Sequence, residues 1–172
     1  DGLVKTAKKH GHKLISASAS EGTLGREHLH ELLELVEQSE YVYILETNGM
    51  TLGADEGFAK SLAKYKKLHV RVSIKGTSPE EYHKLTGAKP ESYRLPFLGL
   101  GHLIDAGVSC NACVMISFSD DEGIKNVKRM LADTYPGILK SLELEDITLF
   151  PKVAERLKHE GLQPVTVRNP HR

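Results

Sequence analysis

The short apolar runs of this sequence are followed by side chains that could bind a ligand, most of them carrying hydroxyl, amide or charged groups. The carboxyl ends of parallel strands meet at one edge of a sheet, so residues that follow such runs are the first candidates for binding. The candidates are Ser18, Ala19, Ser20, Glu21, Glu46, Thr47, Asn48, Ser73, Lys75, Met115, Ser117 and Phe150. Together they would suit a polar small molecule.

Each of these residues alone also has an ordinary structural explanation. Ser, Thr, Asn and Glu cap helices and close turns without any ligand. Glu46 and Lys75 differ from the rest, because a charge at the end of an otherwise buried strand needs a partner or a ligand. The two residues could satisfy that need by pairing with each other, so the residues alone leave both explanations open.

The two cysteines, Cys110 and Cys113, have the C-x-x-C spacing of zinc and redox sites. Both fall inside a predicted strand, where residues i and i+3 point to opposite faces and cannot bind one ion without a bulge. Zinc would need two further ligands, and the sequence has no second C-x-x-C or H-x3-H motif. We therefore predict buried thiols and assign no metal ligand.

Strands and helices alternate along the chain after an opening helix that ends near Gly11. The predicted strands are Lys13–Ser16, Tyr41–Leu45, His69–Ile74, Val108–Phe118 and Ile147–Phe150, most of them apolar on both faces. The predicted helices are Arg26–Gln38, Asp55–Lys66, Pro79 to about Gly87, Pro96–Ala106, Asp120–Asp133 and Pro151–Glu160. Ser78 would cap the third of these, and Gly99 would allow close helix packing in the fourth.

This alternation predicts an α/β protein with parallel strands joined by right-handed crossovers, either an open sheet or a partial barrel. A chain that opens on a helix lacks the strand that should precede it. We therefore expect either that a first strand is missing or that the open sheet never had one.

Composition excludes some classes of protein. The chain has 172 residues, with 23 Lys plus Arg against 23 Asp plus Glu, so there is no basic excess for nucleic acid or an anionic membrane. No apolar run is long enough to span a bilayer, and two cysteines are too few for a disulfide scaffold. These features predict a cytoplasmic protein.

Several motifs, taken in order, resemble the core of radical S-adenosylmethionine (radical SAM) proteins, and the likeness is to archaeal members. The matching segments are Leu14–Leu29, Ile44–Gly49, Val70–Gly76, Leu85–Ala88, Leu103–Gly107 and Phe150–Gly161. The resemblance covers residues 1–162 as the core and leaves 163–172 as a C-terminal tail. It implies a partial (β/α)6 TIM-like barrel of parallel strands, with the first strand missing here.

The resemblance also implies two cofactors, S-adenosylmethionine and a four-iron four-sulfur (4Fe-4S) cluster, whose reaction yields a 5′-deoxyadenosyl radical that abstracts hydrogen from a substrate. The segment Ser18–Glu21 would occupy the family's Gly-Gly-Glu-Pro loop at the methionine amino group, where only Glu21 matches. Thr47 and Asn48 would lie beneath the cofactor, with Glu46 beside them. Ser73 and Lys75 would lie near its ribose and carboxylate, Met115 and Ser117 on the next strand, and Phe150 at the adenine edge.

The family's C-x3-C-x2-C cluster motif is absent from this sequence, so no cluster ligand is assigned. Two hypotheses follow. In the first, the chain belongs to a radical SAM enzyme that receives electrons from a reductant protein and acts on a small molecule or another, unknown substrate. In the second, it is a cluster-less relative that binds a small molecule or a partner. A third, family-independent hypothesis is an open-sheet binding domain that uses Glu46 and Lys75.

Overall fold

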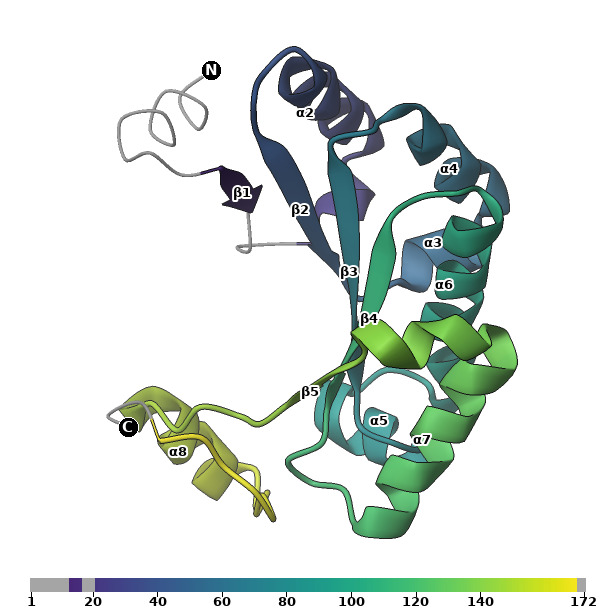
Figure 1. Cartoon of the computed structure of the whole chain (residues 1–172). Helices are drawn as coiled ribbons and strands as arrows, with labels where there is room; N and C mark the ends of the chain where they lie inside the picture. The colour runs from purple at the N-terminus through teal and green to yellow at the C-terminus, as the bar shows by residue number, and fades with distance from the viewer. Residues whose placement is uncertain (1–12, 17–20, 170–172) are drawn as a thin grey trace. The chain divides into compact units, whose positions relative to one another are not determined.

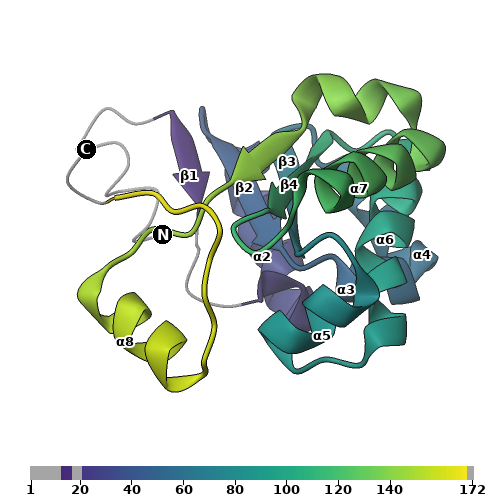
Figure 2. The same cartoon turned by 90° about the horizontal axis from the view of Figure 1, so that it is seen from below.

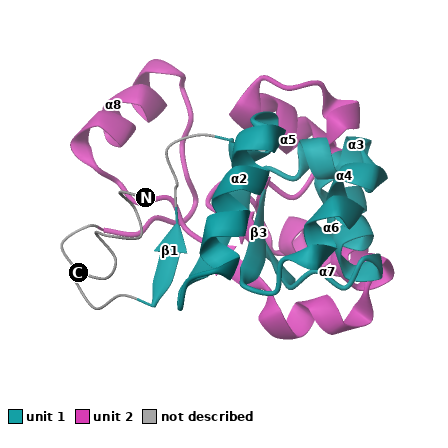
Figure 3. Ribbon diagram, turned by 90° about the horizontal axis from the view of Figure 1, so that it is seen from above, with its two compact units in different colours: residues 1–73, 94–112 teal, residues 74–93, 113–172 magenta. Residues whose placement is uncertain are grey.

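The computed structural model describes residues 13–16 and 21–169, and the chain divides into two compact units (Figures 1 and 3). Unit 1 comprises Asp1–Ser73 and Arg94–Ala112, and unit 2 comprises Ile74–Tyr93 and Cys113–Arg172. The predicted opening helix and the candidate residues Ser18, Ala19 and Ser20 lie outside the described residues.

Five parallel strands form one sheet in the order β1-β2-β3-β4-β5. They are β1 (Leu14–Ser16), β2 (Val42–Thr47), β3 (Leu68–Lys75), β4 (Cys110–Met115) and β5 (Glu143–Glu145). This spatial order repeats the chain order, as in the wall of a (β/α) barrel, whereas a doubly wound sheet reverses direction at a switch point. The predicted α/β class and partial TIM-like barrel are confirmed.

Four α-helices and two 3-10 turns belong to the described part of unit 1. They are η1 (Gly22–Leu24), α2 (Arg26–Glu37), α3 (Met50–Ala54), α4 (Glu56–Ser61), η2 (Leu62–Lys64) and α6 (Leu95–Asp105). Helices α3 and α4 both pack against α6 (Figures 1 and 2). The prediction of one helix over residues 55–66 missed α3, and η2 replaces the last turn of that helix.

The helices of unit 2 are α5 (Pro79–Thr86), α7 (Asp121–Thr134) and α8 (Pro151–His159), together with the 3-10 turns η3 (Pro90–Arg94), which ends at the unit boundary, and η4 (Pro136–Ser141). The predicted start of α5 is confirmed, because the Ser78 hydroxyl accepts a hydrogen bond from the Glu81 amide at 3.1 Å. Gly87 ends the helix with a positive φ of 71°.

The strand β3 has one apolar and one polar face, so the prediction of strands apolar on both faces is wrong here. Leu68, Val70, Val72 and Ile74 are at most 2% exposed. The alternate side chains, His69, Arg71, Ser73 and Lys75, are half-buried. Helices cover the first set, while the second set forms a polar row that requires partners or a ligand.

The last strand also differs from prediction. The apolar run Ile147–Phe150 is not a strand, and β5 instead comprises Glu143–Glu145, in register with Cys113–Met115 of β4. Thr148 makes a single parallel bridge to Arg168, and Phe150 precedes α8 with 54% of its surface exposed. None of the described helices is both long and apolar enough to cross a membrane.

Candidate functional site

The Glu21 carboxylate binds the end of β2 and lies at the centre of the candidate site in unit 1. Its Oε1 accepts hydrogen bonds from the hydroxyls of Thr47 at 2.7 Å and Thr23 at 2.6 Å, and from the Thr23 amide at 3.2 Å. Its Oε2 accepts one from the Asn48 amide at 2.7 Å. Three candidate residues, Glu21, Thr47 and Asn48, therefore come together, whereas Thr23 was missed by the sequence analysis.

The turn after β2 has a conformation that only glycine adopts readily. Gly49 has a φ of 74°, and a Cβ there would lie 2.7 Å from Val72 Cγ1 and 3.0 Å from Pro96 Cα. The Asn48 side chain accepts a hydrogen bond from the Met50 amide at 2.9 Å, which starts α3. This turn directs the Asn48 amide toward Glu21.

Helix α6 supports the same turn from behind. A Cβ on Gly99 would lie 2.8 Å from the Gly49 carbonyl oxygen and 3.1 Å from the Gly53 amide nitrogen. The His102 ring hydrogen-bonds the Leu52 carbonyl at 2.9 Å. The predicted role of Gly99 in close packing is therefore confirmed, and its partners are α3 and the Gly49 turn.

Glu46 has an ion-pair partner in unit 1, Arg71, with 3.5 Å between Oε1 and Nη1. The two residues lie opposite one another in the β2–β3 register. The Arg71 side chain is only 17% exposed, so this pair is shielded more than a surface pair. Arg71 is not among the predicted site residues because it lies inside a strand rather than after one. Ser73, two residues further along β3, is half-buried on the same polar face.

The remaining candidates belong to unit 2. Lys75 and Met115 line a cavity of about 460 Å³, together with Phe118, Glu145 and Asp146. Ser117 and Phe150 do not line this cavity. The fully buried Ser117 hydroxyl accepts a hydrogen bond from the Ile147 amide at 2.6 Å, which attaches the segment after β5 to β4.

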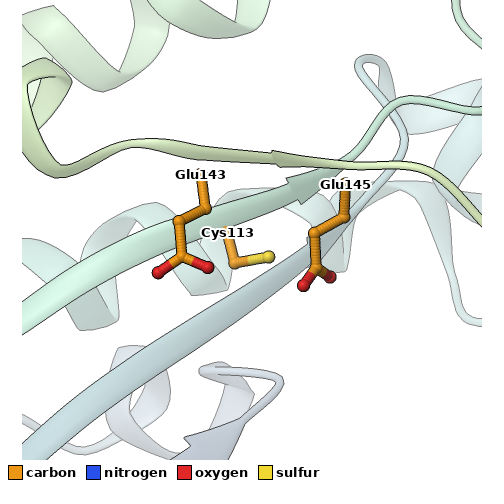
Figure 4. A group of neighbouring side chains, drawn as sticks. All are labelled: Cys113, Glu143 and Glu145. Atoms are coloured by element: carbon orange, nitrogen blue, oxygen red, sulfur yellow. The ribbon is translucent and has the colours of Figure 1, made fainter.

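Three potential metal-binding side chains meet on β4 and β5 of unit 2 (Figure 4). The ligand atoms of Cys113, Glu143 and Glu145 lie within 4.8 Å of one another, and Cys113 is fully buried. Each of the three residues also takes part in a hydrogen bond or an electrostatic interaction within the protein. The two glutamates were missed because the last strand was predicted four residues too late, at Ile147.

The cysteines of this chain do not fit an iron–sulfur cluster. A 4Fe-4S cluster of the radical SAM type needs three thiolates from one loop, and the sequence has two cysteines, both on β4. Burial raises the pKa of the Cys110 thiol to about 11, which disfavours the thiolate that iron binds. Cys113 is buried as predicted, whereas Cys110 is half-buried.

The comparison with family models agrees with the fold. Residues 2–131 match the model of the Radical SAM superfamily, and the chain belongs to that family. Members of this family use S-adenosylmethionine and a 4Fe-4S cluster as cofactors.

Two archaeal proteins are similar in sequence, and both carry the name "Probable GTP 3′,8-cyclase". The protein from Methanosarcina acetivorans is 29% identical over 99% of this chain and 52% of its own length. The one from Pyrobaculum aerophilum is 33% identical over 51% of this chain and 28% of its own length. The chain thus spans about half the length of the Methanosarcina relative.

Solved structures support the fold. SuiB of Streptococcus suis bound to S-adenosylmethionine has a TM-score of 0.61 at 16% identity, covering 77% of this chain and 30% of that one. AnSMEcpe with bound AdoMet has a TM-score of 0.51 at 18% identity, covering 98% of this chain and 53% of that one.

Proposed function

We propose that this chain is the S-adenosylmethionine-binding part of a radical SAM enzyme whose substrate is a nucleotide, as the names of the two archaeal relatives suggest. The observation that carries the proposal is the Glu21 carboxylate, held at the ends of β1 and β2 by Thr23, Thr47 and Asn48. This position belongs to the part of the chain that the family model matches.

The Glu21 cluster suits the amino group of S-adenosylmethionine. Among the described residues, Oε2 accepts a hydrogen bond only from the Asn48 amide, and a carboxylate oxygen can accept more than one. The Glu21 side chain is only half-buried, so an ammonium group can reach it. A charge-assisted hydrogen bond would then orient the methionyl end of the cofactor.

The chain's own residues would bind and orient S-adenosylmethionine. The cofactor itself would supply the chemically difficult steps of the reaction. Thr47 and Asn48 fix the direction of the Glu21 carboxylate, and Gly49 fixes the turn that holds Asn48. Because Cys110 and Cys113 do not fit the cluster, we propose that its three thiolates come from cysteines outside these 172 residues.

Two measurements test the proposal. Titration calorimetry should detect S-adenosylmethionine binding to the wild type, and Glu21→Gln should weaken it about tenfold, as expected for the loss of a charge-assisted hydrogen bond. Glu40→Gln, a change of an exposed glutamate away from the cluster, is the matched control. Binding that is absent, or equal in both variants, would overturn the proposed role.

Iron and sulfide analysis under anaerobic conditions, with an absorption spectrum, tests the enzyme itself. The natural protein that contains this chain should hold about four irons per polypeptide, as one cluster of the family type requires. A second candidate, a cluster-less binding protein, is favoured by the count of only two cysteines. Retained S-adenosylmethionine binding without iron in the natural protein would establish that second candidate.

A further inference from the structure

The cavity at the carboxyl ends of β3 and β4 in unit 2 has a lysine on its wall that no described residue pairs with. Lys75 lies on its wall, and among residues 13–16 and 21–169 no group forms an ion pair or hydrogen bond with the Lys75 ammonium. The side chain is half-buried. An ammonium group in a mostly apolar cavity loses part of its hydration, so a bound anion would stabilise it.

The rest of the lining indicates what kind of chemical group would be attached to this anion in the ligand. The apolar and aromatic part consists of Leu85, Met115, Phe118, Ile147, Leu157 and Leu162. At about 460 Å³, the cavity has the size of a small-molecule site. A flat ring system packs well against a phenyl ring and a thioether.

Two carboxylates, Glu145 and Asp146, share the lining with Lys75. Asp146 accepts a hydrogen bond from the Thr166 hydroxyl, and Glu145 also interacts with other groups of the chain. These carboxylates would repel an anion beside them and accept hydrogen bonds from N–H groups. The cavity therefore suits a ligand whose anionic group lies at Lys75 and whose N–H groups lie at Glu145 and Asp146.

The cavity combines residues inside the region that the family model matches, among them Lys75 and Met115, with residues beyond it. The family model ends at residue 131, and members of a family share their cofactor but differ in substrate. The wall formed by Glu145, Asp146, Ile147, Leu157 and Leu162 lies beyond that point. That wall, unlike the one that carries Lys75, lies outside the shared region, and a cavity with such a wall can vary with the substrate.

We infer that Lys75 recognises a phosphate group of a nucleotide substrate whose base occupies this cavity. The inference rests on the proposed function, which supplies the nucleotide. It departs from the placement of Lys75 at the cofactor carboxylate that the family resemblance implies. Lysine acts on phosphate as a compact point charge, so arginine should replace it at least in part.

Titration calorimetry with GTP and guanosine tests the inference on the protein that contains this chain. The wild type should bind GTP more tightly than guanosine. Lys75→Met should weaken GTP binding about tenfold, the loss expected for one charged contact, and leave guanosine unchanged. Lys75→Arg should retain most of the affinity. Lys89→Met, a change of an exposed lysine outside the cavity, is the matched control.

The same titrations with S-adenosylmethionine and with 5′-methylthioadenosine, which lacks the aminocarboxypropyl group, test the alternative that Lys75 binds the cofactor carboxylate. If Lys75→Met weakens S-adenosylmethionine but not GTP, the lysine serves the cofactor carboxylate and the inference is wrong. It is also wrong if the wild type does not bind GTP or if Lys89→Met has the same effect. Failure of the proposed function appears separately, as a wild type that does not bind S-adenosylmethionine.

Discussion

Replacing Glu21 by glutamine tests whether this carboxylate joins the loop after β1 to the end of β2. The amide oxygen of glutamine can still accept from the hydroxyls of Thr23 and Thr47, as Oε1 does now. The amide nitrogen then faces the Asn48 N–H at the position of Oε2, where the present separation is 2.7 Å. Two donors would face each other, and one charge-assisted hydrogen bond is lost.

The expected cost is about 2 kcal/mol of unfolding free energy, because a hydrogen bond to a charged group contributes about 1.5–3 kcal/mol and Asn48 is exposed enough to be rehydrated. For a chain of this size that loss lowers the Tm by about 4–8 °C. Urea and thermal unfolding, with Glu40→Gln as the control, measure it. A difference between the two variants within about 0.5 kcal/mol would refute the reasoning.

A double-mutant cycle with Thr47→Val separates this interaction from general disruption. Thr47→Val removes the donor to Oε1 and the acceptor of the Gly49 amide at 3.1 Å. Because both changes affect one network, we expect a coupling energy of about 1 kcal/mol. Thr47→Ser keeps the hydroxyl and should restore most of the stability. Additive effects of the two substitutions would show that Glu21 and Thr47 act independently.

Three further predictions follow from other parts of the chain. Gly99→Ala places a Cβ 2.8 Å from the Gly49 carbonyl and should cost about 1–3 kcal/mol in urea unfolding, whereas Gly25→Ala, whose nearest contact is 3.8 Å, should cost less than 1 kcal/mol. With its pKa raised from 9.0 to about 11, Cys110 should react with iodoacetamide at pH 8 about 100-fold more slowly than a thiol of the denatured chain, with a tenfold gain per pH unit. The hydrogen bond from Arg26 lowers the pKa of Asp55 below 3.8, so the stability that Arg26→Gln removes is present above that pH and shrinks as the pH falls through the lowered pKa. Urea unfolding would contradict this if the difference in unfolding free energy between the wild type and Arg26→Gln were the same at pH 7 and at pH 2.

Local signals predicted most of the fold correctly. The helix Arg26–Glu37 follows from apolar spacing, and α5 follows from Ser78, Pro79 and Gly87 at their expected positions. The missed helix, Met50–Ala54, has Gly53 near its end, which lowers helix propensity. Packing against α6 overrides that preference, because Gly53 allows the backbone of Leu95 to approach it closely.

The misplaced last strand shows where local signals fail. Ile147–Phe150 is apolar and resembles a buried strand, whereas Glu143–Glu145 carries two charges. The acidic segment forms β5 because it pairs with Cys113–Met115, and the Ser117 hydroxyl holds the Ile147 amide outside the sheet. Such pairing depends on residues some 30 positions away, which no local pattern contains.

The candidate site could be predicted where it follows the end of a correctly predicted strand. Glu21, Thr47 and Asn48 were found by this rule, whereas Arg71 was missed because it lies inside a strand and Glu145 because β5 was misplaced. A parallel sheet usually has both faces covered by apolar packing, yet every second residue of β3 from His69 to Lys75 is polar. The cost of half-burying those groups is offset where partners exist, as for Arg71 with Glu46. Lys75, at the carboxyl end of that strand, has no such partner among the described residues, and this difference is the reason that we propose a substrate phosphate there.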